Sequence, residues 1–302
     1  MFKGMSAVEF AKAFPDNESC YNYLVELKWG KGYVCRRCGC TESVKGRTYY
    51  YKRCKSCKWD ESVTSHTVFH KLKVPILKAF YMAFRLSTKK KGMSTVELGA
   101  EVKIRQKTAW LFKRKLQLAM QTSNSKKKLK GEVNVDETLV GGGKKGSYGR
   151  KHDEKDILFV AVEKLPGDKT GNIALRHIED FSVDSISPAM NDVVDEDVKV
   201  NADDFPTYSS IQKKRPNTKI VSAKGSTFYL ELHKQIMMFK MWLTGIHHKC
   251  SEQHLRAYAS EYEFRFNRRN QRKWIFHNLL SAVFNTKQHS YSQLIALCEI
   301  KA

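Results

Sequence analysis

The spacing of hydrophobic residues changes near residue 130 and divides the chain into two parts. Before that point, apolar residues mostly recur every three or four positions, which predicts amphipathic helices. After it, short apolar runs bounded by glycine, proline and polar residues predict β-strands. The clearest of these runs is 132–142, in which Val133, Val135 and Leu139 occupy alternate positions and glycines close the segment.

The second part of the chain reads as an α/β domain. We expect further strands at 157–162, 172–178, 198–203 and 218–222, with helices at 182–194 and about 227–243. Three strands, a helix, a strand, then a strand and a helix is the element order of a ribonuclease-H-like core. In that order the first and fourth strands are neighbours.

Two aspartates occupy informative places in this order. Asp136 lies in the middle of the first strand, and Asp203 ends the fourth. A carboxylate inside a sheet is costly unless a cation neutralises it. Carboxylates on neighbouring strands can share a pair of divalent ions that activates one oxygen and stabilises another in phosphodiester chemistry. Because all the ligands are oxygens, we expect Mg²⁺ or Mn²⁺.

The residues leave the third position of such a site open. His233 and Lys240 are two helical turns apart and share one face of the helix after Gly225. The imidazole could bind the ion or hydrogen-bond beside it, and the lysine could hold a phosphate. Glu231 is the conventional carboxylate, but it points about 200° away from His233 on a helix. Glu261 is the reserve candidate.

The first part of the chain carries a metal-binding pattern. Apolar positions over residues 6–27 predict one or two short helices, interrupted at Pro15. Two C-x2-C pairs follow, Cys35 with Cys38 and Cys54 with Cys57, and each presents two thiolates to one ion. Four thiolates close a tetrahedral Zn²⁺ site. With a strand expected at 48–51, the simplest shape is a zinc ribbon.

The segment 71–130 has the order of a helix-turn-helix. Pro75 begins one helix, Ser94 with Glu97 caps a second, and a basic third helix runs from about Gln106 to Met120. The start of the third helix is where base-reading side chains are expected, so we predict DNA contacts there from Arg105, Gln106, Lys107 and Thr108. An ordinary three-helix bundle is the alternative.

The charge supports a nucleic-acid partner. The net charge is +23, and residues 1–130 hold 29 basic and 9 acidic side chains against 25 and 22 in the remainder. Later arginines, Arg265, Arg268 and Arg269, alternate with aromatic residues and are expected to line a DNA channel. The sequence contains no membrane-length apolar run and no secretion-type start, and its cysteines fit metal binding, so we expect a cytoplasmic protein.

These patterns predict four segments. Residues 1–70 would hold the N-terminal helices and the zinc ribbon, and 71–128 the helix-turn-helix region. Residues 129–285 would form the catalytic domain, and 286–302 a tail.

Together, the motifs resemble one family. The two cysteine pairs, TVFHKLKVP, KGMSTVELGAEVKIRQKTAWLFKRKL, VNVDETLVGG, NADDFPTYSSI and LHKQIMMFKMWLTGIHH are similar to those of bacterial insertion-sequence transposases with an N-terminal zinc ribbon. This is the ISXO-like group of the DDE superfamily. The resemblance spans about residues 15–285.

The resemblance implies a set of roles. Asp136 and Asp203 would be the two family aspartates, because Tyr208 follows Asp203 at the family spacing; His233 would take the third catalytic position and Lys240 the family lysine. The protein would bind the terminal inverted repeats of its own element on the bacterial nucleoid. It would then cut and join strands of element and target DNA as a homo-oligomer on paired ends. The alternative is a DNA-binding regulator that has lost catalysis.

Overall fold

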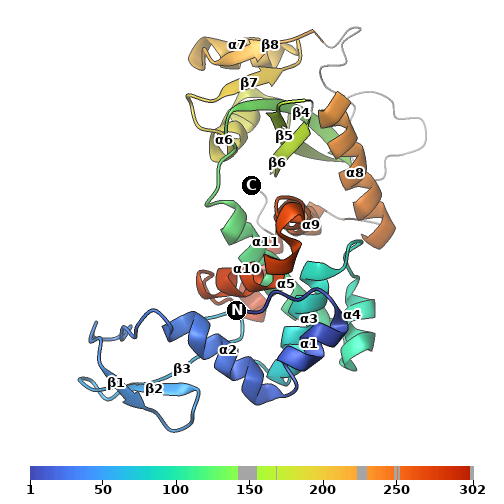
Figure 1. Ribbon diagram of the computed structural model, residues 1–302. Helices are drawn as coiled ribbons and strands as arrows, with labels where there is room; N and C mark the ends of the chain where they lie inside the picture. Colours follow the sequence, from blue (N-terminus) through green and yellow to red (C-terminus); the bar gives the residue numbers. More distant parts are fainter. Residues whose placement is uncertain (142–154, 168, 223–229, 248–249, 251, 300–302) are drawn as a thin grey trace. The chain divides into compact units, whose positions relative to one another are not determined.

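The structure is a computed structural model that describes residues 1–141, 155–167, 169–222, 230–247, 250 and 252–299. The chain forms two compact units. Unit 1 contains Met1–Ala119 and Gln271–Leu294, and unit 2 contains Met120–Asn270 and Ile295–Ala302. Each unit is described separately below, and both can be followed along the chain in Figure 1.

Unit 1 is mainly helical. Its helices are α1 (Ala7–Ala13), α2 (Asn17–Trp29), α3 (Ile76–Thr88), α4 (Thr95–Val102), most of α5 (Gln106–Asn124) and α10 (Ile275–Phe284). Helix α11 (Tyr291–Glu299) begins here, after the short 3-10 helix η1 (Arg269–Trp274). A cluster of aromatic rings forms the centre, where Phe10 and Phe84 lie 4.7 Å apart between centroids and Phe276 of α10 contacts both.

A small three-stranded antiparallel sheet follows α2. Its strands are β1 (Ser43–Lys45), β2 (Tyr51–Cys54) and β3 (Asp60–Ser62), in the order β1-β2-β3. The predicted strand at 48–51 therefore begins only at Tyr51, because residues 48–50 form the turn from β1. Lys28 of α2 pairs with the buried Glu61 of β3 at 2.8 Å, which fixes the sheet to the helix.

Unit 2 is built on a five-stranded mixed sheet in the order β6-β5-β4-β7-β8. The strands are β4 (Glu132–Val140), β5 (Asp156–Leu165), β6 (Lys169–Ile178), β7 (Lys199–Ala202) and β8 (Thr218–Ile220). Strands β4, β5 and β6 pair antiparallel, whereas β7 is parallel to both β4 and β8. All five strands were predicted, and β4 and β7 are neighbours as the ribonuclease-H-like order requires.

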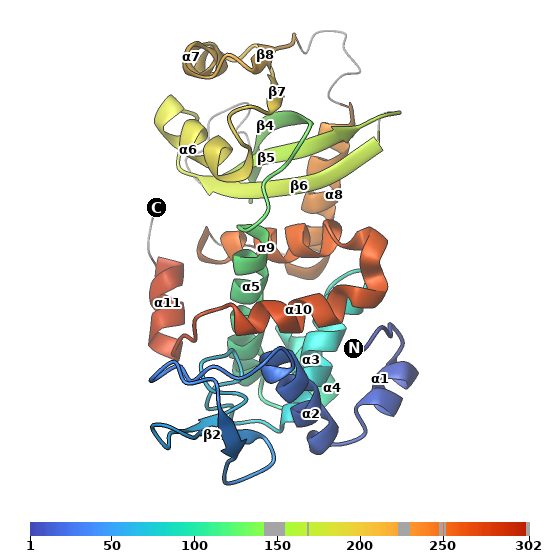
Figure 2. The ribbon, with the colours of Figure 1, turned by 60° about the vertical axis from the view of Figure 1, so that its left-hand side comes forward.

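Helices cover both faces of this sheet (Figure 2). Helices α6 (Val183–Val193) and α7 (Pro206–Lys214) cover one face, over a core that includes Val133, Val135, Val200 and Tyr208. Helices α8 (Leu230–His247) and α9 (Glu252–Phe266) cover the other, over Leu158, Val160 and Ile173. Since side chains alternate along a strand, even-numbered residues of β4 face α8.

The structure also differs from the sequence prediction outside the small sheet. Helix α7, between β7 and β8, was not predicted, although Pro206 stands at its first turn. Near the predicted domain boundary at residue 128, α5 continues to Asn124 and buried Leu129 pairs with Val194. Residues 271–285, assigned above to the catalytic domain, belong to unit 1, where α10 packs on α3.

Candidate metal centres and nucleic-acid interface

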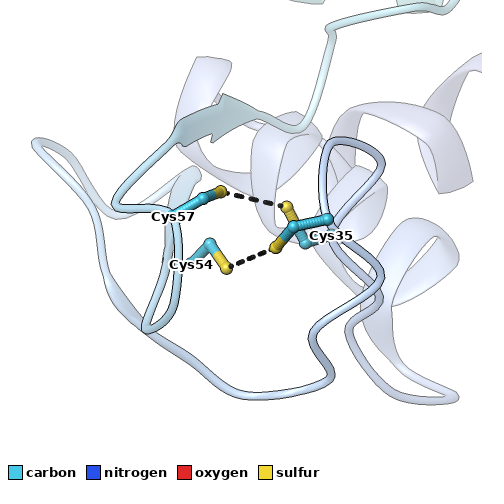
Figure 3. Close-up of side chains that lie close together, drawn as sticks. Cys35, Cys54 and Cys57 are labelled. Carbon is cyan, nitrogen blue, oxygen red and sulfur yellow. Dashed lines mark hydrogen bonds between the residues drawn. The ribbon is translucent and has the colours of Figure 1, made fainter.

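The four predicted zinc ligands converge. The Sγ atoms of Cys35, Cys38, Cys54 and Cys57 all lie within 4.8 Å of one another. Two of the separations are 3.6 Å, from Cys35 to Cys57, and 3.5 Å, from Cys38 to Cys54 (Figure 3). Tetrahedral zinc with Zn–S bonds of about 2.3 Å places its sulfurs about 3.8 Å apart, so the cluster fits the ion.

The pKa values of the four thiols shift in different directions: those of Cys35 and Cys38 are lowered, and those of Cys54 and Cys57 are raised. Although burial opposes it, hydrogen bonds from the backbone N–H groups of Arg37 and Cys38 hold the pKa of Cys35 at about 6. The thiolate is the form that binds metal. Cys40, at one remove from Cys38, lies outside the set, because its Sγ contacts the carbonyl of Glu42. The structure thus brings together the four cysteines chosen from spacing, and Cys40 stays outside them.

The helix-turn-helix order is present in unit 1. Helix α4 begins at the cap Ser94, which accepts from the N–H of Glu97, and ends at Lys103 with φ of 52°. A Cβ on Gly99 would lie 3.0 Å from the carbonyl oxygen of Ile104, so the helix approaches the turn closely only because this residue is glycine.

The expected DNA-reading residues lie at the start of α5. Arg105, Gln106 and Lys107 are exposed, and Thr108 is half-buried. Gln106 donates to the hydroxyl of Thr95 at 3.0 Å, and the ammonium of Lys107 lies 5.5 Å from the ring centroid of Tyr291. Exposure at the start of a third helix is consistent with DNA contact, and the contact itself stays a prediction.

Unit 2 brings the predicted acidic site together around Asp136. Its side chain is 20% exposed, and its Oδ2 lies 3.2 Å from Nε2 of His233 on α8. Its Oδ1 accepts from the N–H of Glu137 at 2.8 Å. Asp203 follows β7, the strand next to β4, and its Oδ1 accepts from the N–H of Phe205 at 3.2 Å.

The charges of these groups influence one another. Burial raises the pKa of Asp136, and the carboxylate of Asp203 raises it further, whereas His233 and the N–H of Glu137 oppose the change. Burial lowers the pKa of Lys240, while Asp136 acts in the opposite direction. A divalent cation between the two carboxylates would relieve the repulsion between them, so this donor set fits a hard, oxygen-binding ion.

The competing third ligands lie elsewhere in unit 2. Glu231 accepts from the hydroxyl of Thr170 at 3.1 Å and lies 3.6 Å from Lys234. Glu261 is fully buried in α9, with Arg265 3.7 Å away. His233 is the candidate that contacts Asp136, which agrees with the helical geometry expected from the sequence.

The three arginines of the predicted DNA channel make contacts within unit 2. Arg268 is buried and donates to the carbonyl of Phe264 and the hydroxyl of Ser123. Arg269 donates to the carbonyls of Phe266 and Gly171, and the side chain of Arg265 is 11% exposed. The guanidinium groups of Arg268 and Arg269 thus have acceptors inside the domain, and DNA contact by the three arginines stays a prediction.

One pair beside the acids was not anticipated. The hydroxyl of fully buried Tyr208 on α7 donates to the carboxylate of Glu137. Because Glu137 follows Asp136 directly, it faces the opposite side of the sheet. The sequence signal was present in the adjacent acids of the β4 strand, but the partner is 71 residues away.

The sheet order and its covering helices define a ribonuclease-H-like α/β core, preceded by a four-cysteine zinc ribbon. Residues 128–267 match the model of the ISXO2-like transposase domain, and residues 15–59 match that of the transposase zinc-ribbon domain. The chain belongs to the IS1595 family of transposases with an N-terminal zinc ribbon.

The chain was also compared with individual curated proteins and with solved structures. No curated protein matches the chain significantly. The crystal structure of a pre-cleavage Mos1 transpososome matches at 10% sequence identity and a TM-score of 0.29, covering 70% of this chain and 79% of that chain. The fold assignment rests on the sheet order and the family match. No described helix is long and apolar enough to cross a membrane.

Proposed function

We propose that the protein is an active DNA transposase. It binds the terminal inverted repeats of its own element and carries out metal-dependent strand cleavage and strand transfer. The observation that carries the proposal is the 3.2 Å contact between Asp136 and His233, with Asp203 on the neighbouring strand, inside a matched transposase domain.

In this proposal Asp136 and Asp203 hold Mg²⁺ or Mn²⁺. A bound divalent ion supplies the positive charge that activates the attacking oxygen and stabilises the leaving one. His233 orients the carboxylate of Asp136 through its hydrogen bond and takes the third position of the site. Lys240, whose charge interacts with that of the same carboxylate, binds a DNA phosphate there.

DNA is delivered by unit 1. Arg105, Gln106, Lys107 and Thr108 read the element end from the start of α5, and the basic excess of residues 1–130 holds the phosphates. We infer that the protein acts as a homo-oligomer on paired ends, on nucleoid DNA in the cytoplasm. A regulator without catalysis is the other class that these DNA-binding parts would serve.

The test is cleavage and joining of a labelled element-end fragment with Mg²⁺ or Mn²⁺. Wild type should cut and join, whereas Asp136→Asn should do neither and still bind the fragment in a mobility-shift assay. His233→Ala should lose activity about 100-fold, as expected for a group that assists proton transfer or ion binding.

Glu231→Gln is the matched control, because Glu231 lies on the same helix but contacts Thr170. Full activity in this variant supports His233 as the third group. If Glu231→Gln is inactive and His233→Ala is active, the assignment is reversed. If wild type binds the end but never cuts it with either metal, the regulator function replaces the enzyme.

A further inference from the structure

Strands β4 and β7 carry a second set of polar residues on the face of the acids. The parallel register aligns Glu132 with Lys199 and Asn134 with Asn201. Asp136 lies two residues beyond Asn134, and Asp203 lies two residues beyond Asn201. Since side chains two apart point to the same side of a strand, each acid follows an asparagine on one face.

The two asparagines bond directly to each other. Nδ2 of Asn201 donates to Oδ1 of Asn134 at 3.0 Å and to a carboxylate oxygen of Glu132 at 2.8 Å. Asn134 is 3% exposed and Asn201 is 1% exposed. The orientation of the Asn201 amide is fixed, because the carboxylate of Glu132 can only accept. Lys199 completes the row by pairing with Glu132 at 3.2 Å.

We propose that Asn134 and Asn201 are positioning residues for the divalent-metal site, an inference that rests on the proposed function. Their hydrogen bond fixes the register of β4 against β7, so that the carboxylates of Asp136 and Asp203 emerge side by side. A slip of one residue would turn one of the acids to the opposite face of the sheet. Strand β7 is only four residues long, so few backbone hydrogen bonds hold this register.

The amide oxygen of Asn201 is a second feature that supports this role. Its Oδ1 is buried and has no hydrogen-bond partner in the described part of the chain. A buried amide oxygen without a partner is costly. Asn201 uses Nδ2 for its hydrogen bonds to Glu132 and Asn134, so its oxygen would be available to accept a hydrogen bond from a group at the metal site.

The test is direct Mn²⁺ binding to the full-length, zinc-loaded protein without DNA, measured by titration calorimetry. Residues that orient metal ligands typically change metal affinity 10- to 100-fold, so the Kd of Asn201→Ala should rise about 10-fold or more. Asn134→Ala, which removes only the acceptor, should rise in the same direction. The double variant should be little weaker than the Asn201→Ala single variant, since both lose one shared bond.

Asn124→Ala is the matched control. Asn124 is also a buried amide of unit 2, and its Nδ2 donates to the carbonyl of Ser260 at 3.0 Å, away from β4 and β7. Its loss should lower thermal stability as much as Asn201→Ala does, with the Kd for Mn²⁺ unchanged. If Asn201→Ala does not fold, the Kd of Asn134→Ala for Mn²⁺ is compared with those of wild type and Asn124→Ala instead.

Catalysis gives an independent readout. In the cleavage assay, Asn201→Ala should need about 10-fold more Mg²⁺ for half-maximal rate and should recover at saturating Mg²⁺. The proposal is overturned if both asparagine variants bind Mn²⁺ as wild type does, or if they weaken it no more than Asn124→Ala. If wild type itself binds no Mn²⁺, the proposed metal site has failed, which is seen before any variant is compared.

Discussion

The four-cysteine site and the Asp136 site assemble their ligands in opposite ways. The cysteines lie within residues 35–57: one pair precedes β1, and the other lies at the end of β2 and in the turn that follows it. Asp136, Asp203 and His233 come from a central strand, the end of its neighbour and a helix that follows much later. Local chain geometry therefore builds the first site, whereas the topology of a whole sheet builds the second.

The two sites also differ in how closed they are. Four sulfur ligands fill every position of a tetrahedral ion, which is typical of a structural site. At the other site, His233 keeps 60% of its side chain exposed beside a largely buried carboxylate. That arrangement leaves room for a substrate. We therefore expect the metal at the four-cysteine site to matter for folding and the metal at the Asp136 site to matter for chemistry.

Removing one cysteine should have the largest effect. Cys38 is exposed, so Cys38→Ser removes a ligand with little loss of packing. Zinc binding is worth about 10–16 kcal/mol in small zinc modules, so the ribbon should release its ion and unfold. Zinc content should fall from one ion per chain to none, and limited proteolysis should cut within residues 15–59.

Cys40→Ser provides the control for this change, because Cys40 contacts the carbonyl of Glu42 rather than the other sulfurs. It should keep one zinc and resist the protease. A full zinc content in Cys38→Ser would show that three sulfurs and another ligand are enough to bind the ion. The four cysteines would then not all be needed to close the zinc site, which would contradict the contrast with the Asp136 site.

The next largest effect tests how much the contact between the ribbon and α2 stabilises the protein while zinc stays bound. Lys28→Met keeps the aliphatic stem but leaves Glu61, which is 1% exposed, without its 2.8 Å partner and with the longer 3.7 Å contact to Arg36. Breaking a buried ion pair costs about 3–5 kcal/mol. Urea unfolding of the zinc-loaded protein should show this loss. Arg53→Met, which removes the more exposed pair with Asp60, should destabilise the protein much less, because solvent screens an exposed pair.

Equal effects of the two variants would contradict this prediction. They would indicate that the zinc ion alone holds the ribbon and that the contact with α2 adds nothing to it.

The sequence revealed most about features fixed over short distances. The cysteine spacing predicted the zinc ligands, and the alternation in 132–140 predicted β4 with Asp136 at its centre. The neighbouring placement of β7 followed from the element order. His233 was preferred over Glu231 by helical angle alone, and its contact with Asp136 agrees with that choice.

Features that depend on distant partners were not accessible in this way. From the sequence alone, Arg268 is expected to be an exposed cation. The structure shows that it donates to the carbonyl of Phe264 and the hydroxyl of Ser123. The apolar residues of α10 predict a buried face but not the helix that packs against it. The sequence therefore did not predict that α10 packs on α3 in unit 1. Likewise, no local pattern pairs Asn201 with Asn134, which lie 67 residues apart.

The smallest expected effect compares one aspartate from each region. The folded-state pKa of Asp136 is raised by burial and by Asp203, so its charge opposes folding above the unfolded pKa of about 3.9. Without added Mg²⁺ or Mn²⁺, Asp136→Asn should therefore melt slightly higher than wild type at pH 7, and the difference should vanish as the pH falls below that value. Asp60 has the opposite sign, because its hydrogen bond with Arg53 lowers its pKa. Asp60→Asn should melt lower than wild type at pH 7 and match it at low pH.

Adding Mn²⁺ should reverse the order at Asp136 alone. A ligand at 100 times its Kd stabilises the folded state by about 2.7 kcal/mol, and only the protein with an intact site gains this. Wild type should then melt above Asp136→Asn at pH 7, while Asp60→Asn should keep its deficit and rise in parallel with wild type. Thermal melts at two pH values, with and without Mn²⁺, supply the whole comparison. If Asp136→Asn is less stable than wild type before any ion is added, the carboxylate of Asp136 stabilises the sheet, and its burial is structural rather than a cost sustained for metal binding.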